Sequence, residues 1–232
     1  MKVVAIIQAR LGSTRLPGKV LADLSGEPML AHVVWRTAAV AGVDEVVVAT
    51  TDRPADDAIA SLCAQRGWPS FRGSEPDVLD RYYRAAVAHQ ADHVVRVTSD
   101  CPLVCTVQAS RVVERHLQAG NDYTHNITVW GSGLPLGANA EIFRLSALEA
   151  AWRDGREPHH REHVDEYVYE HPERFRIERV DAPPELHRPT MRITVDTPED
   201  IERVRRIYAR LYRPGALIDV REVVALLDAE AA

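Results

Sequence analysis

The sequence predicts an α/β fold in which a mostly parallel sheet is flanked by helices. Two patterns indicate it. Short apolar runs, such as residues 3–7 and 45–50, have almost no polar interruption, which is typical of strands buried on both faces. They alternate with amphipathic segments of helical length, as in repeated strand–helix–strand units. A chain of 232 residues, 46% of them hydrophobic, is large enough for one such domain with an elaboration.

The first part of the chain follows this alternation closely. The strand at residues 3–7 opens into a polar loop that ends at Lys19. Ser25-Gly26-Glu27-Pro28 is a helix-start signal with proline near the first turn. Gly42 and Gly67 are expected to end the first and second helices. The pattern predicts strands at residues 3–7, 45–50, 70–71 and 93–98, and helices at residues 28–40, 54–66, 77–90 and 106–118.

The alternation changes between residues 121 and 190, where glycines, prolines and histidines accumulate. We interpret residues 121–190 as a small α+β insertion in a single domain spanning residues 1–232, which covers the functional site or forms a homodimer contact. The elements expected in and after it are strands at residues 140–144, 174–180 and 191–195, helices at residues 146–153 and 160–170, a helix opening at residues 196–199 and running to 212, and a last helix at residues 220–227.

The composition of the chain argues against some classes of binding partner. A net charge of −6 argues against broad binding to nucleic acid or to an anionic membrane. Cys63, Cys101 and Cys105 form neither a CxxC pair nor a zinc-binding spacing, and they suit a reducing cytosol. No signal peptide precedes the first strand, and no apolar run reaches the length of a membrane span. We therefore expect a cytoplasmic protein that binds neither nucleic acid nor membrane.

The loop after the first strand has the composition of a triphosphate-binding site. Small residues let backbone N–H groups approach a ligand, and the cations can neutralise a polyanion. Lys19 provides a mobile point charge, whereas Arg10 and Arg15 can hold phosphate oxygens in pairs. This is not a P-loop, because five residues separate Gly12 from Gly18 and valine follows Lys19. The alternative is an ordinary surface loop with solvated arginines.

Asp100 and Asp196 each follow an apolar run directly, and each precedes a turn that contains proline. Either carboxylate alone is equally well explained as a turn residue or a helix cap. Together they can meet at the carboxyl edge of a parallel sheet, where ligands bind in such folds. Mg²⁺ is typically held by one or two carboxylates together with substrate phosphates. The pair therefore predicts a magnesium site.

A second polar loop, Arg72-Gly73-Ser74, follows the third predicted strand and is a candidate contact for the nucleotide. Asp77, at a helix start, is as readily a cap as a ligand contact, and Asp80 and Arg81 are readily explained as ion-pairing residues on a helix surface. The histidines His159, His160 and His163 do not form the HExxH zinc signature. We favour a solvated or dimer-facing cluster.

Several of these segments also resemble a known family. QARLGSTRLPGK, FRGSEPDVLDRYY, VRVTSDCPLV, REHVDEYVYEHPERF and VDTPEDIE, in this order, are similar to the SpsF-type cytidylyltransferases of spore-coat and surface polysaccharides. These are in turn similar to the cytidylyltransferases that activate 3-deoxy-manno-octulosonate and acylneuraminates. The resemblance implies a Rossmann-like nucleotide-diphospho-sugar-transferase fold, CTP as donor and Mg²⁺ as cofactor. It implies nucleotide contacts at Gln8, Ala9, Arg10, Gly12, Ser13, Arg15, Lys19, Arg72, Gly73 and Ser74, and magnesium ligands at Asp100 and Asp196.

One segment departs from that family. SpsF-like chains often have Gly-Leu-Asp-x-Glu where this chain has Gly137-Ala138-Asn139-Ala140-Glu141. A neutral amide replaces one carboxylate, which would better tolerate an acidic acceptor, such as a sugar acid or a phosphonate. We predict acceptor contacts at Asn139, Glu141 and His163, and no general base is identifiable.

The implied reaction is Mg²⁺-dependent transfer of CMP from CTP to a sugar acid or related acidic acceptor, with release of pyrophosphate. Positioning and charge neutralisation dominate such transfers, so Arg10, Arg15, Lys19 and Asp100 are the predicted catalytic residues. One alternative is a glycosyltransferase that uses a nucleotide-sugar, although Asp100-Cys101-Pro102 lacks the DxD metal motif. Another is a sensor that binds nucleotide without turnover. The residues alone do not distinguish CTP from UTP or ATP.

Overall fold

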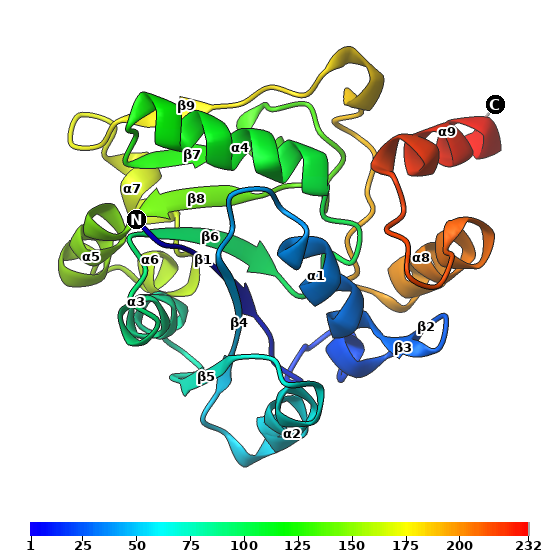
Figure 1. Cartoon of the computed structure of the whole chain (residues 1–232), viewed down its shortest axis with the longest axis horizontal. Helices are drawn as coiled ribbons and strands as arrows, with labels where there is room; N and C mark the ends of the chain where they lie inside the picture. Colours follow the sequence, from blue (N-terminus) through cyan, green and yellow to red (C-terminus); the bar gives the residue numbers. More distant parts are fainter. Residues whose placement is uncertain (232) are drawn as a thin grey trace.

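A seven-stranded sheet forms the centre of the computed structural model, which describes residues 1–231 (Figure 1). Its strand order is β5-β4-β1-β6-β8-β7-β9, and only β8 runs against its neighbours. The mostly parallel α/β fold predicted from the sequence is therefore confirmed. The strands are β1 (Val3–Gln8), β4 (Glu45–Thr51), β5 (Ser70–Gly73), β6 (His93–Thr98), β7 (Tyr123–His125), β8 (Glu141–Arg144) and β9 (Ile177–Arg179).

Helices cover both faces of the sheet because the residues of β1 alternate between two apolar cores. Ala5 and Ile7 pack with the helices of one face, whereas Val4 and Ile6 pack with those of the other. The first face carries α1 (Met29–Ala38), α2 (Asp57–Arg66) and α4 (Thr106–Ala119). The second carries α3 (Val78–Ala88), α5 (Leu145–Asp154) and α7 (Glu166–Glu170).

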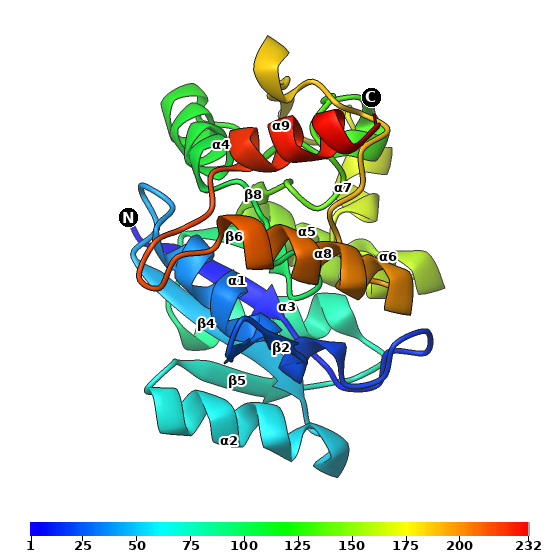
Figure 2. The same cartoon turned by 90° about the vertical axis from the view of Figure 1, so that its right-hand side faces the viewer.

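A third apolar core lies beside the sheet, where α8 (Pro198–Leu211) and α9 (Val220–Ala231) pack together. Both helices lie at the right-hand side of the molecule in Figure 1, and Figure 2 shows them facing the viewer. Ile193 and Val195 are buried in this core rather than in the sheet. The strand predicted at residues 191–195 is therefore wrong: the segment bends at Thr194, and within residues 1–231 its only ladder contact is a single bridge between Arg192 and Leu136.

Three other predicted elements differ in detail. Ser25 and Gly26 have left-handed backbones and form the turn of a small hairpin, β2 (Asp23–Leu24) and β3 (Glu27–Pro28), so the first helix begins only at Met29 and ends before Gly42. The helix predicted at residues 160–170 is divided into α6 (Pro158–Glu162) and α7, because His163 is extended and Val164 turns into the core. The strand predicted at 174–180 shortens to β9.

Residues 121–190 contribute β7, β8 and β9 to the same sheet, together with α5, α6 and α7. This region therefore shares the central architecture of the molecule. Among the residues that the structure describes, no helix is both long enough and apolar enough to cross a membrane.

Candidate functional site

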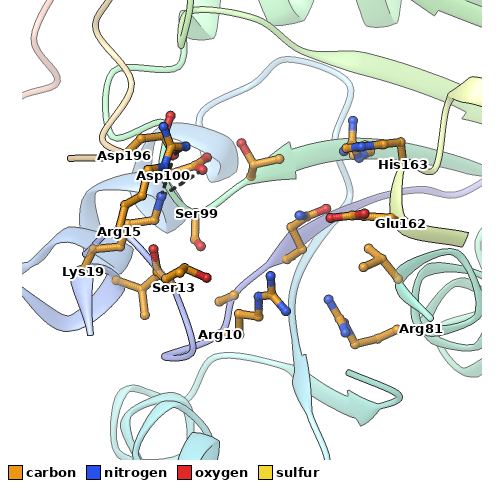
Figure 3. Close-up of a pocket in the computed structure, with 17 residues that line it drawn as sticks. Arg10, Ser13, Arg15, Lys19, Arg81, Ser99, Asp100, Glu162, His163 and Asp196 are labelled. Atoms are coloured by element: carbon orange, nitrogen blue, oxygen red, sulfur yellow. Dashed lines mark hydrogen bonds and ion pairs between the residues drawn. The ribbon is translucent and has the colours of Figure 1, made fainter. Parts of the chain in front are cut away.

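A cavity of about 290 Å³ opens at the carboxyl ends of β1 and β6, where a parallel sheet is expected to bind ligands (Figure 3). Its lining comes from the loop after β1, from α3, from the end of β6, and from two segments far along the chain. The lining residues are Gln8, Ala9, Arg10, Ser13, Thr14, Arg15, Lys19, Val20, Val78, Arg81, Arg96, Thr98, Ser99, Asp100, Glu162, His163 and Asp196. We call it the nucleotide cavity.

The loop after β1 is shaped by backbone hydrogen bonds. The Gly18 N–H donates to the Leu11 carbonyl at 3.0 Å and closes the loop, while the Leu11 N–H donates to Asp56 at 2.7 Å. Gly18 has a left-handed backbone (φ 73°), which glycine adopts at little cost, and it begins the short 3₁₀ turn at Lys19–Leu21. This turn directs the Lys19 side chain back into the cavity, where only 10% of it is exposed.

Lys19 joins the two aspartates that the sequence predicted as a pair. Its Nζ donates to Asp100 Oδ2 at 3.2 Å, to Asp196 Oδ1 at 3.0 Å and to the Val195 carbonyl at 2.6 Å. The ammonium thus uses its three donors on the protein, and Figure 3 shows the three side chains gathered at one end of the cavity. Arg15 approaches Asp196 Oδ1 at 3.2 Å from the solvent side.

The neighbouring cations keep the Asp196 carboxyl ionised. Burial opposes the charged form, but hydrogen bonds from Lys19 and Arg192 and the charge of Arg15 outweigh it and lower the pKa of the carboxyl. The segment that carries Asp196 is anchored because the Val195 N–H donates to the Asp100 carbonyl at 2.8 Å. The two carboxylates are therefore held together by the main chain as well as by Lys19.

The donor set at this point fits a divalent cation. Asp100 and Asp196 converge on one cationic position, now taken by the Lys19 ammonium, and hard oxygen ligands of this kind suit Mg²⁺. Asp100 and Asp196 are the residues that would hold such an ion.

A second cavity, of about 370 Å³, adjoins the first, and we call it the acceptor cavity. The two share Arg96, Thr98, Asp100, His163 and Asp196, and the second also contains Asn139, Glu141 and Asp165. Its base is a buried network in which Arg96 pairs with Glu141 and, at 3.4 Å, with Asp165. Burial and the nearby Asp165 charge raise the pKa of Glu141 to about 7, although Arg96 and the Tyr123 hydroxyl oppose the shift.

The three predicted acceptor contacts have different surroundings. His163 is exposed and lines both cavities. Glu141 lines the acceptor cavity but accepts from Arg96 and from Tyr123, the latter at 2.6 Å. Asn139 lines it as well, yet its amide donates to the Asn126 carbonyl at 2.7 Å and to Thr128 Oγ1 at 2.8 Å. In this structure the Asn139 amide therefore holds its own loop against residues 126–128.

Four predicted nucleotide contacts lie outside the lining of the nucleotide cavity. Arg72 donates to the carbonyls of Thr51 and Arg53 and pairs with Asp57 at 2.7 Å, so it braces neighbouring loops. Ser74 Oγ accepts from the Asp77 N–H, and Asp77 in turn caps α3. Gly73 and Gly12 are also absent from the lining.

Two arginines of the nucleotide cavity were not predicted as site residues. Arg96 alternates with buried residues of β6, and nothing in its pattern marks it. The sequence favours an ion-pairing role for Arg81 on a helix surface, and this interpretation is wrong, because Arg81 is 2% exposed and lines the cavity. Its helical spacing to the inward-facing Val78, Tyr82 and Ala85 was the available signal.

The histidines of α6 connect this helix to α7 through hydrogen bonds to Glu170. His159 Nε2 lies 2.9 Å and His160 Nε2 lies 2.8 Å from the two oxygens of Glu170, and among residues 1–231 these three form the one group with metal-binding spacing. However, the Glu157 N–H donates to Nδ1 of His160, which places the ring proton on Nε2 and leaves no lone pair for an ion. His160 is buried rather than solvated.

A parallel sheet with an arginine- and lysine-lined cavity at the carboxyl ends of its strands defines a nucleotide-binding α/β protein. The model of the family described as cytidylyltransferase matches residues 4–219. The chain belongs to the cytidylyltransferase family, and it is a CTP-dependent nucleotidyltransferase, as the sequence predicted.

Relatives agree with this membership. An uncharacterised protein of Methanocaldococcus jannaschii is 39% identical over 98% of this chain and 91% of its own length. The spore coat polysaccharide biosynthesis protein SpsF of Bacillus subtilis is 34% identical over 97% of this chain and 94% of its own. A 3-deoxy-manno-octulosonate cytidylyltransferase of Trichlorobacter lovleyi is 38% identical over only 50% of this chain and 46% of its own.

Solved structures share the fold. A cytidylyltransferase from Leptospira borgpetersenii has a TM-score of 0.88 and 31% identity, covering 100% of this chain and 95% of that one. A CMP:2-keto-3-deoxy-manno-octonic acid synthetase in complex with CTP has a TM-score of 0.65 and 22% identity, covering 90% and 99%. A manganese complex of a Mycobacterium tuberculosis protein has a TM-score of 0.60 and 15% identity, covering 89% and 99%.

Proposed function

We propose that this enzyme uses Mg²⁺ to transfer CMP from CTP to a sugar acid or a related acidic small molecule, with release of pyrophosphate. The observation that carries the proposal is the position of Asp100 and Asp196. Both line the nucleotide cavity and the acceptor cavity, so they stand at the boundary where a bound donor and a bound acceptor would meet. Reaction between two bound molecules depends on such a shared boundary.

The chain's own residues supply positioning and charge. Arg10, Arg15 and Lys19 line the nucleotide cavity and are suited to neutralise the triphosphate and the departing pyrophosphate. An acceptor oxygen attacks the α-phosphorus, the bond to the bridging oxygen of pyrophosphate breaks, and the acceptor proton passes to water or a nearby base. A divalent ion, when bound at Asp100 and Asp196, supplies further neutralisation of phosphate charge.

The acceptor cavity is lined by five carboxylates, but two basic residues among them, Arg96 and His163, are suited to bind an acidic acceptor. Arg96 already compensates Glu141 and Asp165, whereas the exposed His163 side chain makes no hydrogen bond among the residues that the structure describes. Burial and the nearby Asp165 charge raise the pKa of Glu141, which favours its neutral form and lessens its repulsion of an acid. The name of the Bacillus subtilis relative supports a product used in surface polysaccharide.

A pyrophosphate-release screen tests the proposal. CTP, UTP, ATP and GTP are each combined with Mg²⁺ and a panel of sugar acids, phosphosugars, phosphonates, and neutral and amino sugars. The expected result is release with CTP and an acidic acceptor only, abolished by EDTA and restored by Mg²⁺. Release with neutral or amino sugars alone would contradict the acidic acceptor, and binding of CTP with no release from any acceptor would indicate a nucleotide sensor.

We also propose a cytoplasmic homodimer whose contact includes residues 121–190. Val129 is 75% and Tyr169 38% exposed, and Tyr169 stacks on Trp130 with ring centroids 3.6 Å apart. Exposed apolar side chains of this kind support a protein contact. Cys63, Cys101 and Cys105 are free thiols, which supports a reducing compartment.

A further inference from the structure

Arg81 is a buried arginine whose charge has no carboxylate partner among residues 1–231. Its Nη1 donates to the backbone carbonyl of Ser74 and, at 3.5 Å, to that of Glu75. Its Nε is buried without any hydrogen-bond partner in the described part of the chain. Burial lowers the pKa of its guanidinium. Burying a cation without a counter-charge is costly, so a bound ligand is the natural partner for its unused edge.

The place of Arg81 in the cavity indicates which part of a nucleotide it meets. Figure 3 shows Lys19, Asp100 and Asp196 at one end of the nucleotide cavity and Arg81 at the other, with its guanidinium pointing toward Arg10 and the interior. A nucleotide whose triphosphate lies at the Lys19 end extends its base toward Arg81. Val78, one helical turn before Arg81, lines the same cavity and offers an apolar surface for a planar ring.

We propose that Arg81 selects the base of the nucleotide, with Nε–H and Nη2–H donating in parallel to N3 and O2 of cytosine. This inference rests on CTP as the donor. Cytosine presents these two acceptors side by side, and a guanidinium edge presents two donors with matching spacing. In uracil N3 carries a proton, so one of the two donors faces another donor. UTP therefore leaves a buried polar group unpaired, which is the strong form of discrimination.

A second unpaired atom of the same cavity complements the first. Oε1 of Gln8, at the end of β1, is buried without a hydrogen-bond partner among the described residues. It is an acceptor, and the exocyclic amine of cytosine is the donor next to N3 on the same edge. Uracil has a carbonyl there instead. An unpaired donor, Nε of Arg81, and an unpaired acceptor, Oε1 of Gln8, in one cavity suit the edge of cytosine.

The competing explanation is that Arg81 holds a phosphate together with Arg10. Arg10 already has a counter-charge in Glu75, 3.8 Å away, and Figure 3 shows Arg15 and Lys19 at the opposite end of the cavity from Arg81. Binding experiments separate the two explanations, because the base and the phosphates can be offered individually. They need no acceptor, and without an acceptor no transfer occurs.

The test compares the affinities of CTP, UTP and inorganic tripolyphosphate, each with Mg²⁺, by isothermal titration calorimetry on the full chain. Arg81→Lys keeps the cation but loses the planar pair of donors. We expect it to weaken CTP binding about 10- to 100-fold, the range for one bidentate base contact, while UTP and tripolyphosphate change less than threefold. Arg84→Lys is the matched control, because Arg84 lies on the exposed side of the same helix and pairs with Asp80 at 2.7 Å. Equal losses for CTP and UTP, a loss for tripolyphosphate, or no loss at all would overturn the proposal.

A second measurement needs no variant and so does not depend on how Arg81→Lys folds. The unaltered protein is titrated with 3-deazacytidine triphosphate, in which N3 is replaced by a C–H group. We expect at least tenfold weaker binding than for CTP. Equal affinity for the two nucleotides would overturn the role of Arg81 while leaving the enzyme's donor in place. Failure of CTP itself to bind would instead contradict the donor.

Discussion

The chemistry of the site is concentrated in a few side chains, of which Lys19 occupies the most constrained position. It lies between two carboxylates and is almost completely buried. Because three negative or partly negative oxygens surround one ammonium, this residue compensates charge that the fold has brought together.

Asp100→Asn tests the metal role directly. The change keeps the size of the side chain but removes the charge that a divalent ion requires, so we expect kcat to fall at least about 100-fold. CTP affinity, measured by calorimetry without Mg²⁺, should change less than about threefold, since the cations of the loop after β1 remain. An unchanged kcat would exclude Asp100 from the metal site.

Lys19→Met tests the cation position. We expect kcat/KM for CTP to fall at least about 100-fold, and the free energy of unfolding to fall by about 1–3 kcal/mol, because two carboxylates lose their shared partner at a partly exposed site.

Mg²⁺ should raise the Tm of the Lys19→Met variant more than that of the unaltered protein, because the ion can take the vacated position. Lys2→Met is the control, since Lys2, the only other lysine, pairs with Glu45 at 2.7 Å far from the cavity. An equal Mg²⁺ effect on both variants would contradict the shared position.

At the scale of elements, the segment before Asp196 depends on close packing against Gly137. Gly137 has a positive φ of 102°, and a Cβ there would lie 2.6 Å from the backbone nitrogen of Thr194. The loop at 137 and the segment at 191–195 therefore fit together only with glycine. This contact contributes to the position of Asp196.

Gly137→Ala should consequently damage both stability and activity. We expect a loss of more than about 3 kcal/mol in the free energy of unfolding, from backbone strain and the clash together, and at least about a tenfold fall in kcat. Gly26→Ala is the matched control: φ is 89° but nothing lies within 4 Å, so only about 1–2 kcal/mol should be lost, with kcat unchanged. Urea denaturation and steady-state kinetics measure both. Similar losses in the two variants would show that the close contact is unimportant.

The packing of α4 against the sheet makes the fold sensitive to acid. His116 is fully buried, its ring approaches His93 at 2.9 Å and Thr124 at 3.0 Å, and burial lowers its pKa to about 3. Since the folded pKa is depressed, the unfolded chain binds the extra proton below about pH 6.5, and stability falls as pH falls from there toward 3.

His116→Gln should reduce this dependence. Between pH 7.5 and 5 the unaltered protein should lose about 2 kcal/mol more than the variant, as measured by urea denaturation at each pH. His187→Gln, at an exposed position, should leave the pH dependence as it is in the unaltered protein. A variant at position 116 with the unaltered slope would show that His116 does not titrate as described.

For the whole molecule, the sequence predicts the parallel half of the sheet because its strands are uninterrupted apolar runs. It also predicts Asp100 and Asp196 as neighbours, because both follow such runs. The apolar pattern of residues 191–195 also predicts a strand of the sheet, but this prediction is wrong. Ile193 and Val195 are buried in the third core, beside the sheet. Periodicity reports which side chains are buried, and the partner that buries them depends on the tertiary fold.

Apart from these two aspartates, the candidate site is predictable only where its residues are close together in the sequence. The loop after β1 is continuous in sequence, so its cations are found together. Arg81 and Arg96 reach the cavity from a helix and a strand whose orientation depends on the assembled sheet. Arg72, by contrast, has the right residue type next to the site, but nearby backbone carbonyls and Asp57 take its donors.

We propose that the molecule assembles as a homodimer, and its mass in solution tests this. Light scattering coupled to size exclusion should give twice the chain mass of 25.9 kDa. Val129→Glu places a charge on the exposed apolar patch of residues 121–190 and should shift the mass toward the monomer. A monomeric mass for the unaltered protein would contradict this assembly.

We propose that the triphosphate of CTP is held between the loop after β1 and a divalent ion on Asp100 and Asp196. The most direct measurement is anomalous diffraction from crystals grown with CTP and Mn²⁺. We expect an ion bound to oxygens of both aspartates and of the triphosphate, at about the 2.1 Å typical of such sites, with the cytosine against Arg81. An ion that contacts neither aspartate would contradict it.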